Sequence, residues 1–350
     1  MLELDGSRYS GSGTIVRQAV AFAALTGQSI HVRNARVRRP KPGLRTQHLK
    51  VVEAIREMVH GEMEGVRLGS QEFIFSPGAT DDAQHYTWDI GSAGSTILFA
   101  LAILPILAFR SNPMTVELIG GIFQDFAPSV YHLQHVILPL LHKMGLYADV
   151  AMLRPGYVPR GGGMLRMTVT PLRDGLQPIL LEQPPDIEKV WGIALASHLE
   201  ERKVSQWMAA AARAVLAKSG YYASIQTHDE STALQPGAAL SLFADVAGGA
   251  RLGADMAGAP GRRAETIGKR VSKRILEEIE GGATVDRYAA DQIIPFAVLA
   301  SGQTRYRVSA GSEHIESNAW LARDFVGAEV ALRDRVLSVS GVGFRRNSSR

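Results

Sequence analysis

The chain has 350 residues, which is more than one typical domain needs and enough to bury a sizeable apolar core. Hydrophobic residues make up 46% and charged residues 21%, as in ordinary globular proteins, which excludes intrinsic disorder for most of the chain. Because the chain has no cysteine, disulfide scaffolds, thiolate metal sites, iron–sulfur clusters and cysteine nucleophiles are all excluded.

The N-terminal residues and the longest apolar run both argue against secretion and membrane insertion. Glu3 and Asp5 lie where a signal peptide needs basic residues, and no apolar segment with a cleavage site follows them. The apolar run over 95–109 contains Pro105 and is shorter than the ~20 residues that span a bilayer. The sequence therefore predicts a cytoplasmic protein without a membrane partner, in which this run forms a buried helix.

Charge is distributed unevenly along the chain. The formal net charge is +4, but residues 6–52 contain nine cations and no acidic residue, so the rest of the chain carries −5. A long basic segment attracts polyanions, and the arginine fork matches the geometry of phosphate. We therefore expect a nucleic acid or a nucleotide as the partner, with a solvated basic loop as the alternative. The nine cations are Arg8, Arg17, Arg33, Arg36, Arg38, Arg39, Lys41, Arg45 and Lys50.

Strand and helix patterns occur twice in the same order. The first set is a strand over 1–5, a helix over 16–25, an extended segment over 29–32, a helix over 47–59, and strands over 66–68 and 72–75. The second set is a strand over 86–90, a helix ending at 109, a strand over 115–119, a helix over 131–144, and two strands ending at 170. This order predicts an internal βαβαββ repeat.

A third set is predicted near the C-terminus, interrupted by an insertion. Its elements are a first strand over 178–182, a helix over 289–300, a strand over 305–308, a helix over 317–325, and a hairpin of 328–332 with 336–340. The insertion contains strands over 190–196, 223–227 and 239–246, a helix over 204–216 and a helix from 264. Two adjacent prolines at 184 and 185 mark its entry, because prolines fit poorly inside helices and central strands. We expect an α/β core of residues 1–184 and 277–350 with a smaller inserted α/β domain over 185–276.

Glycine-rich turns and short polar blocks lie at the ends of the expected elements. The turn over 10–14 joins the first strand to the first helix, where backbone N–H groups can bind an anion, but a plain packing turn has the same pattern. It lacks the Gly-Lys-Ser/Thr of a P-loop and the spacing of a Rossmann fingerprint. The other blocks are Arg36, Arg39, Pro42-Gly43-Leu44 followed by Gln47-His48-Leu49, the turn over 91–95, Gly161-Gly162-Gly163, Asp291-Gln292 and His314-Ile315-Glu316-Ser317-Asn318.

Taken together, these blocks resemble the RNA 3′-terminal phosphate cyclase family, in the same order along nearly the whole chain outside the insertion. The Pro-Gly-Leu-x-x-Gln-His-Leu block over 42–49 is the most distinctive match. The resemblance implies three βαβαββ units with a smaller inserted α/β domain, in agreement with the repeats. It also implies an enzyme that uses ATP to convert an RNA 3′-phosphate into a 2′,3′-cyclic phosphodiester, through a covalent histidine–AMP intermediate and an RNA adenylate.

The resemblance also implies roles for individual residues. His314 takes the position of the catalytic nucleophile, and neutral imidazole is a competent nucleophile near neutral pH. Pro128 and Tyr288 match positions that sandwich adenine, which suits an aromatic face and a flat apolar ring. A divalent cation, Mg²⁺ or Mn²⁺, is expected, with no protein ligand assigned to it. ATP or the adenylate is further expected to contact Arg17, Asp291 and Gln292, and the RNA or its phosphate to contact Arg36, Arg39, Gln47 and His48.

Several positions depart from the family pattern. The Glu-Gly-Gly-Gly-Gln turn of the family is replaced by residues 10–14, so that Ser10 removes a carboxylate expected near the metal–ATP complex. Leu101 replaces a common glutamine, and Ile122 and Tyr131 replace polar residues. The alternative function is therefore a catalytically weakened, cyclase-like RNA-binding scaffold, as in a ribosome-biogenesis branch that lacks the nucleophile. The presence of His314 favours the enzyme.

Two further functions fit parts of the sequence. Enolpyruvyl transferases share repeated βαβαββ units, but that class gives no reason for the His-x-x-Ser-Asn block. A metal hydrolase would use His132 and His135, but without a His-Glu-x-x-His pattern a solvated helix face is expected there. No obligate protein partner is predicted, and the sequence does not specify the RNA. A solvated helix is expected around Arg262, Arg263, Lys269, Lys273 and Arg274, and a frayed tail with Arg345, Arg346 and Arg350.

Overall fold

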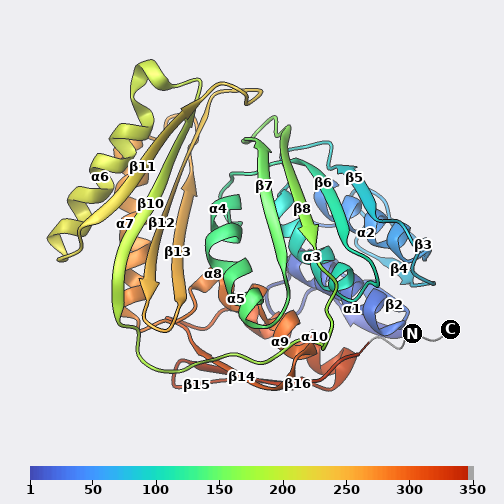
Figure 1. Cartoon of the computed structure of the whole chain (residues 1–350). Coiled ribbons are helices and arrows are strands. Elements are labelled where there is room, and N and C mark those ends of the chain that lie inside the picture. Colours follow the sequence, from blue (N-terminus) through green and yellow to red (C-terminus); the bar gives the residue numbers. More distant parts are fainter. Residues whose placement is uncertain (346–350) are drawn as a thin grey trace.

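The computed structural model describes residues 1–345, so Arg346 and Arg350 of the expected tail lie outside the described residues. This part of the chain folds into four sheets of four strands each, with helices packed between and against them (Figure 1). Within it, no helix is both long enough and apolar enough to cross a membrane.

The first unit has the predicted βαβαββ order. Its elements are β1 (Leu2–Asp5), α1 (Gly13–Thr26), β2 (Ile30–Arg33), α2 (Thr46–Met58), β3 (Glu62–Glu64) and β4 (Phe73–Ser76). The strands lie in the order β1-β2-β4-β3, with β1 and β2 parallel. The strand predicted over 66–68 is wrong: the chain turns there between Gly65 and Gly69, both at positive φ, and the strand that pairs with β4 lies before this turn.

The second unit repeats this arrangement. Its elements are β5 (His85–Asp89), α3 (Thr96–Ala108), β6 (Met114–Gly120), α4 (Val130–His132), α5 (Leu138–Lys143), β7 (Ala148–Arg154) and β8 (Gly163–Val169). A π-helical segment, η1 (Leu133–Ile137), joins α4 to α5. The strands lie in the order β5-β6-β8-β7, which is the order of the first sheet.

The third unit is completed by a strand that precedes the insertion. Its elements are β9 (Leu180–Leu181), α8 (Arg287–Gln292), α9 (Ile294–Leu299), β14 (Ser301–Arg307), α10 (Glu313–Val326), β15 (Glu329–Arg333) and β16 (Val336–Val342). The strand order is β9-β14-β16-β15, so all three units share one topology, as predicted. Helix α10 begins four residues before the predicted helix, because the Ser312 side chain accepts a hydrogen bond from the N–H of Ile315 and caps it. His314 therefore lies in the first turn of α10.

Helices α1 and α3 lie at the centre of the three repeated units, enclosed by the other helices and the sheets (Figure 1). Every residue of α3 except Leu98 is buried, and the helix is apolar around its whole circumference, which is typical of a helix enclosed on all sides. The prediction of a buried helix in the run over 95–109 is confirmed. The three units consequently share one apolar core.

The insertion forms a fourth sheet with helices packed on one face. Its elements are β10 (Ile187–Ser197), η2 (Glu200–Arg202), α6 (Val204–Lys218), β11 (Ala223–Glu230), β12 (Gly237–Val246), β13 (Ala250–Ala257) and α7 (Ala264–Glu280), and the strand order is β11-β10-β12-β13. Strand β13 is missing from the predicted elements, because its alanines and Gly253 weaken a strand pattern. The domain boundaries at 185 and 276 stay a prediction.

Alternate residues of this sheet face two different neighbours. On β12, Leu240 and Leu242 belong to the apolar cluster under α6 and α7, whereas Phe243 belongs to the central core. This is the period-two alternation of a strand that is buried on both faces. On β13, Gly253 and Asp255 share the face turned toward α4 and η1, and Figure 1 shows β13 as the strand beside α4.

Candidate active site

The first turns of α1, α2 and α10 meet at one place, although they are far apart in the sequence. At the start of α1, Thr14 Oγ1 lies 3.0 Å from Nδ1 of His314 on α10. A Cβ on Gly13 would lie 2.1 Å from Nε2 of His48 on α2, so only glycine permits this approach. Because helix N-termini carry unpaired N–H groups and a partial positive charge, their convergence favours a bound anion.

His314 is accessible and electrostatically biased toward its neutral form. Its side chain is 40% exposed, and its Nδ1 lies 4.0 Å from Oδ2 of Asp291. Burial, followed by the positive charges of Arg17 and Arg39, lowers the pKa of His314 below its ordinary value of 6.5. At pH 7 the imidazole is therefore neutral, and one ring nitrogen has a free lone pair.

Four arginines of the basic segment lie around this point. Arg17 is buried and donates from Nη2 to Thr14 Oγ1 at 3.3 Å, and burial lowers its pKa to about 10. Burial also lowers the pKa of Arg36, and the nearby charges of Arg39 and Arg45 lower it further. Since four positive charges are held close together, the site carries an excess of positive charge that bound phosphate groups can neutralise.

Gln47 and His48 reach the same place from the start of α2. Gln47 Oε1 accepts a hydrogen bond of 3.0 Å from the N–H of Ser95, so it holds the turn that begins α3. Burial and the charges of Arg17 and other nearby arginines lower the pKa of His48 well below its ordinary value. Its Nδ1 accepts a hydrogen bond of 3.2 Å from the N–H of Arg45. Nε2 faces Gly13 and lies 3.4 Å from Nε2 of Gln47, so the buried ring holds the starts of α1 and α2 together.

Asp291 and Gln292 lie behind His314 at the end of α8. Burial raises the pKa of Asp291 to about 7, although Gln292 Nε2 donates to its carboxylate at 2.9 Å and Arg17 lies nearby. Asn318 Nδ2 donates to the carbonyl oxygens of Asp291 and His314, both at 3.1 Å. The Asn of the His-x-x-Ser-Asn block therefore ties α10 to α8 and fixes the backbone of His314.

Pro128 and Tyr288 lie on two segments that His132 brings together. Tyr288 is in the first turn of α8, and Pro128 precedes the first residue of α4 by two positions. The imidazole of His132 packs edge-on against the ring of Tyr288, with 6.1 Å between ring centroids. Pro128 is buried, whereas Tyr288 is partly exposed.

The prediction that His132 and His135 lie on a solvated helix face is wrong. His132 is fully buried, and its Nε2 lies 3.0 Å from Oδ2 of Asp286, which is also fully buried. His135 is half-buried and packs edge-on against Trp191 and Phe243 of the insertion. A local sequence pattern cannot reveal these contacts, because the partners lie more than 50 positions away.

The cations around the start of α7 divide into two groups. Arg263, Lys269 and Lys273 are exposed, as predicted. The other two are not solvated: Arg262 donates to both carboxylate oxygens of Asp125, at 3.0 and 2.7 Å, and Arg274 donates to the carbonyl of Asp255 at 2.9 Å. These two arginines therefore stabilise packing rather than extend a free basic surface.

Hydroxyl groups occupy the turn where the family has a carboxylate. Ser10 Oγ lies 2.8 Å from Ser317 Oγ and 3.0 Å from Ser12 Oγ, and all three side chains are buried. Leu101 and Ile122 are buried among apolar side chains. Within residues 1–345, no three histidine or carboxylate side chains are grouped to hold a metal ion. The described residues do not fit a metal site built from protein ligands alone.

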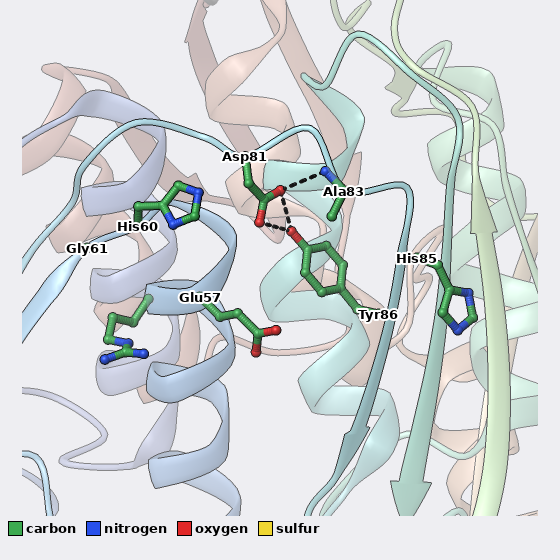
Figure 2. A pocket seen from close by; sticks show the side chains of 8 residues that line it. Glu57, His60, Gly61, Asp81, Ala83, His85 and Tyr86 are labelled. Atoms are coloured by element: carbon green, nitrogen blue, oxygen red, sulfur yellow. Dashed lines mark hydrogen bonds between the residues drawn. The ribbon is translucent and has the colours of Figure 1, made fainter.

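A polar pocket of about 530 Å³ lies at the opposite end of α2 (Figure 2). Figure 2 shows Asp81 and Tyr86 hydrogen-bonded to each other beside Glu57 and His60. Arg110 Nη1 also donates to Asp81 at 2.6 Å. Because ten residues of α2 separate His48 from Met58, this pocket lies about 15 Å from His48 along the helix. Its central carboxylate, that of Asp81, is already paired with Arg110 and Tyr86, so we interpret the pocket as structural rather than as a binding site.

Comparison with known proteins identifies the family. The model of the RNA 3′-terminal phosphate cyclase family matches residues 8–332. The RNA 3′-terminal phosphate cyclase of Archaeoglobus fulgidus is 37% identical to this chain, and the match covers 94% of this chain and 97% of the relative. The cyclase of Pyrococcus abyssi is 34% identical, with 93% of this chain and 94% of the relative covered. The cyclase of Methanopyrus kandleri is 32% identical, with 96% of each chain covered. A solved structure, the enolpyruvyl transferase NikO from Streptomyces tendae, matches with a TM-score of 0.43 and 12% identity over 97% of this chain and 49% of that chain. The resemblance found in the sequence is confirmed, and the chain belongs to the RNA 3′-terminal phosphate cyclase family of enzymes.

Proposed function

We propose that this protein converts the 3′-terminal phosphate of an RNA into a 2′,3′-cyclic phosphodiester in an ATP-dependent reaction. The observation that carries the proposal is a neutral, accessible His314 at the meeting point of three helix N-termini and four arginines. A nucleophile surrounded by positive charge suits attack on a phosphate group. Family membership supports the reaction class.

In the first step, His314 attacks the α-phosphorus of ATP and pyrophosphate leaves. Nδ1 contacts Thr14 Oγ1, so Nε2 is the nitrogen that is free to form the P–N bond. This requires the Nδ1 proton to be donated to Thr14, whose oxygen has two lone pairs and can accept from both His314 and Arg17. The charge that develops on the phosphates is stabilised by Arg17 and its neighbours.

In the remaining steps, the adenylyl group activates the RNA end. An oxygen of the RNA 3′-phosphate attacks the α-phosphorus, the P–N bond breaks, and His314 is restored. The adjacent 2′-hydroxyl then attacks the activated 3′-phosphorus, loses its proton, and releases AMP as the ring closes. Arg36 and Arg39 are the cations placed to hold the RNA phosphate, and Gln47 and His48 support the turns beside it.

The adenine ring is assigned to the space between Pro128 and Tyr288. A partly exposed phenol ring and a buried proline ring offer apolar faces of the size of a nucleobase. Asp291 and Gln292 lie on the same helix as Tyr288, between it and His314. The adenylate would therefore extend from Tyr288 toward His314 along α8.

The second candidate function is an RNA-binding scaffold with weakened catalysis. It is favoured by Ser10, whose hydroxyl is bonded to Ser317 where the family has a carboxylate. Without a carboxylate, a divalent cation bound with ATP would depend on phosphate oxygens and water for its ligands.

The test is covalent labelling of the purified protein with α-labelled ATP and either Mg²⁺ or Mn²⁺, followed by denaturing electrophoresis. Acid-labile label is expected on the unaltered protein and on the control His228→Ala, whose histidine is exposed on β11, but not on His314→Ala. Label on His314→Ala at the unaltered level would remove His314 from its role. No label on the unaltered protein with either metal would favour the scaffold.

A further inference from the structure

Three acidic and basic side chains are buried together beneath Pro128 and Tyr288. The exposed fractions are 0% for His132 of α4, 0% for Asp286 before α8, and 6% for Asp255 of β13. Such groups destabilise a fold unless each is paired or hydrogen-bonded, so their contacts define what they hold in place. We call these three residues the buried network.

Asp286 holds the backbone of Tyr288. Its Oδ1 accepts hydrogen bonds from the N–H groups of Tyr288 and Ala289, at 2.9 and 3.0 Å, and thereby caps α8. Its Oδ2 accepts a hydrogen bond of 2.9 Å from the N–H of Gly253 on β13. Nε2 of His132 lies 3.0 and 3.1 Å from the two oxygens. One carboxylate therefore joins Tyr288, the helix α4 and the inserted strand β13.

Asp255 holds the segment of Pro128. Its Oδ2 accepts a hydrogen bond of 2.8 Å from the N–H of Ser129, the residue after Pro128. Ser129 Oγ accepts from the N–H of His132 at 3.2 Å and lies 3.2 Å from Oγ of Ser241 on β12. Ser129 is therefore fixed between the first turn of α4 and the sheet of the insertion.

His132 is hydrogen-bonded to Asp286 through Nε2, whereas Asp255 acts on it only through its charge and Nδ1 of His132 has no hydrogen-bond partner among the described residues. Burial acts to lower the pKa of His132, but Asp286 and then Asp255 act in the opposite direction and the pKa is raised. Burial acts to raise the pKa of Asp286, but His132 lowers it. A Cβ on Gly253 would lie 2.6 Å from Cδ2 of His132, so the strand carries glycine where the imidazole packs. The geometry of the three residues is therefore tightly determined.

Gly253 and Asp255 are alternate residues of β13 and share one face of the strand. Through that face the insertion touches both segments that hold the proposed adenine site: Gly253 reaches Asp286 before Tyr288, and Asp255 reaches Ser129 after Pro128. We propose that the buried network positions Pro128 and Tyr288 around adenine, so that strand β13 of the insertion is a structural part of the nucleotide site. This inference rests on the proposed function, because that function assigns the two residues to adenine.

The test compares Asp255→Asn with the matched control Asp245→Asn. Asp245 lies on the neighbouring strand β12 and bonds to Trp191 and Arg251, outside the buried network. Asp255→Asn keeps the shape of the side chain but removes the charge that binds Ser129. We expect the KM for ATP to rise about tenfold in the labelling reaction, because a charge-assisted hydrogen bond to Ser129 becomes a weaker neutral one. The labelling rate at saturating ATP should change much less. Asp245→Asn should leave both parameters unchanged.

A second readout separates positioning from a general loss of stability. The affinity for inorganic triphosphate, which lacks adenine, should be the same in Asp255→Asn as in the unaltered protein. A second variant, His132→Gln, keeps a donor near Asp286 and should show the same selective loss for ATP if the first variant fails to fold. The inference would be overturned if the variant bound ATP and triphosphate more weakly by the same factor, or if a folded variant had an unchanged KM for ATP. If the unaltered protein bound no ATP, the proposed function would fail together with it.

Discussion

The nucleophilic role that we propose for His314 depends on residues that are remote from it in sequence. Thr14 holds Nδ1, which leaves Nε2 available, and nearby cations disfavour protonation of the ring. Both effects act in the same direction, since an unprotonated Nε2 is the form that attacks phosphorus. In the proposed mechanism, the histidine therefore needs no separate general base for adenylylation.

The charge of Arg39 predicts a pH effect. Burial, Arg17 and Arg39 lower the pKa of His314, so the acid limb of adenylylation should lie below pH 6.5 in the unaltered protein. Arg39→Gln removes one of these cations, which raises the pKa of His314 and moves the acid limb to higher pH. Single-turnover labelling between pH 5 and 8 should show that Arg39→Gln lowers the labelling rate, relative to the unaltered protein, by a larger factor at pH 6 than at pH 8.

Loss of a phosphate contact alone would give a different pH profile. If Arg39 only binds phosphate, Arg39→Gln should lower the rate by the same factor at every pH. Lys218→Gln, at the end of α6, serves as the control for removal of a positive charge elsewhere on the molecule. A ratio of rates independent of pH would contradict the electrostatic role.

At the scale of one element, α2 connects the proposed active site to the paired charges at its other end. Arg110 is 5% exposed in its side chain, and it donates to Asp81 and to the carbonyl of Met58, the last residue of α2. Arg110→Met should lower the free energy of unfolding by about 3 kcal/mol, because it removes the positively charged partner of the Asp81 carboxylate and leaves only its neutral donors. Chemical denaturation measures this change.

The same substitution should leave the labelling of His314 unchanged at low temperature, since about 20 Å separate the two ends of α2. Arg56→Met is the matched control, because Arg56 lines the same pocket but is exposed. An equal loss of stability in Arg56→Met, or none in Arg110→Met, would show that the buried pair does not stabilise this end of the helix.

The repeated units could be predicted from sequence because their elements have strong local patterns. The apolar run of α3 and the alternation along β14 and β16 indicate their structures without knowledge of their partners. Strand β13 and strand β3 were not predicted in place, because small residues, glycine and glutamates dominate them. These two strands form through pairing with β12 and β4, which supplies the hydrogen bonds that their side chains do not specify.

At the scale of the whole molecule, the basic segment over 6–52 predicts salt-sensitive RNA binding. Four of its nine cations, Arg17, Arg36, Arg39 and Arg45, gather around the site, whereas the remaining chain carries a net negative charge. The logarithm of the binding constant for a single-stranded RNA ending in a 3′-phosphate should fall linearly with the logarithm of salt concentration. Arg36→Gln should reduce the steepness of this line by about 0.7, the effect of one phosphate contact on a single strand.

The control for this measurement is again Lys218→Gln, which should leave the slope unchanged. Fluorescence anisotropy at four or more salt concentrations, without ATP, gives the slope for each variant. An unchanged slope for Arg36→Gln would mean that Arg36 acts only on the fold, where it donates to the carbonyl oxygens of Lys41 and Gly43.

The sequence by itself determined the three βαβαββ units, the family, the basic segment and the proposed roles of His314, Arg17 and Tyr288. The repeated units and the basic segment depend on patterns of residues close together in the chain. The family and the proposed residue roles follow from the resemblance of short sequence motifs to those of the RNA 3′-terminal phosphate cyclases. Only the tertiary structure decided that Thr14 contacts His314, that His132 pairs with Asp286, and that β13 reaches both segments beside Pro128 and Tyr288. Those contacts join residues up to 300 positions apart, and they exist because packing brings three helix N-termini and one inserted strand together.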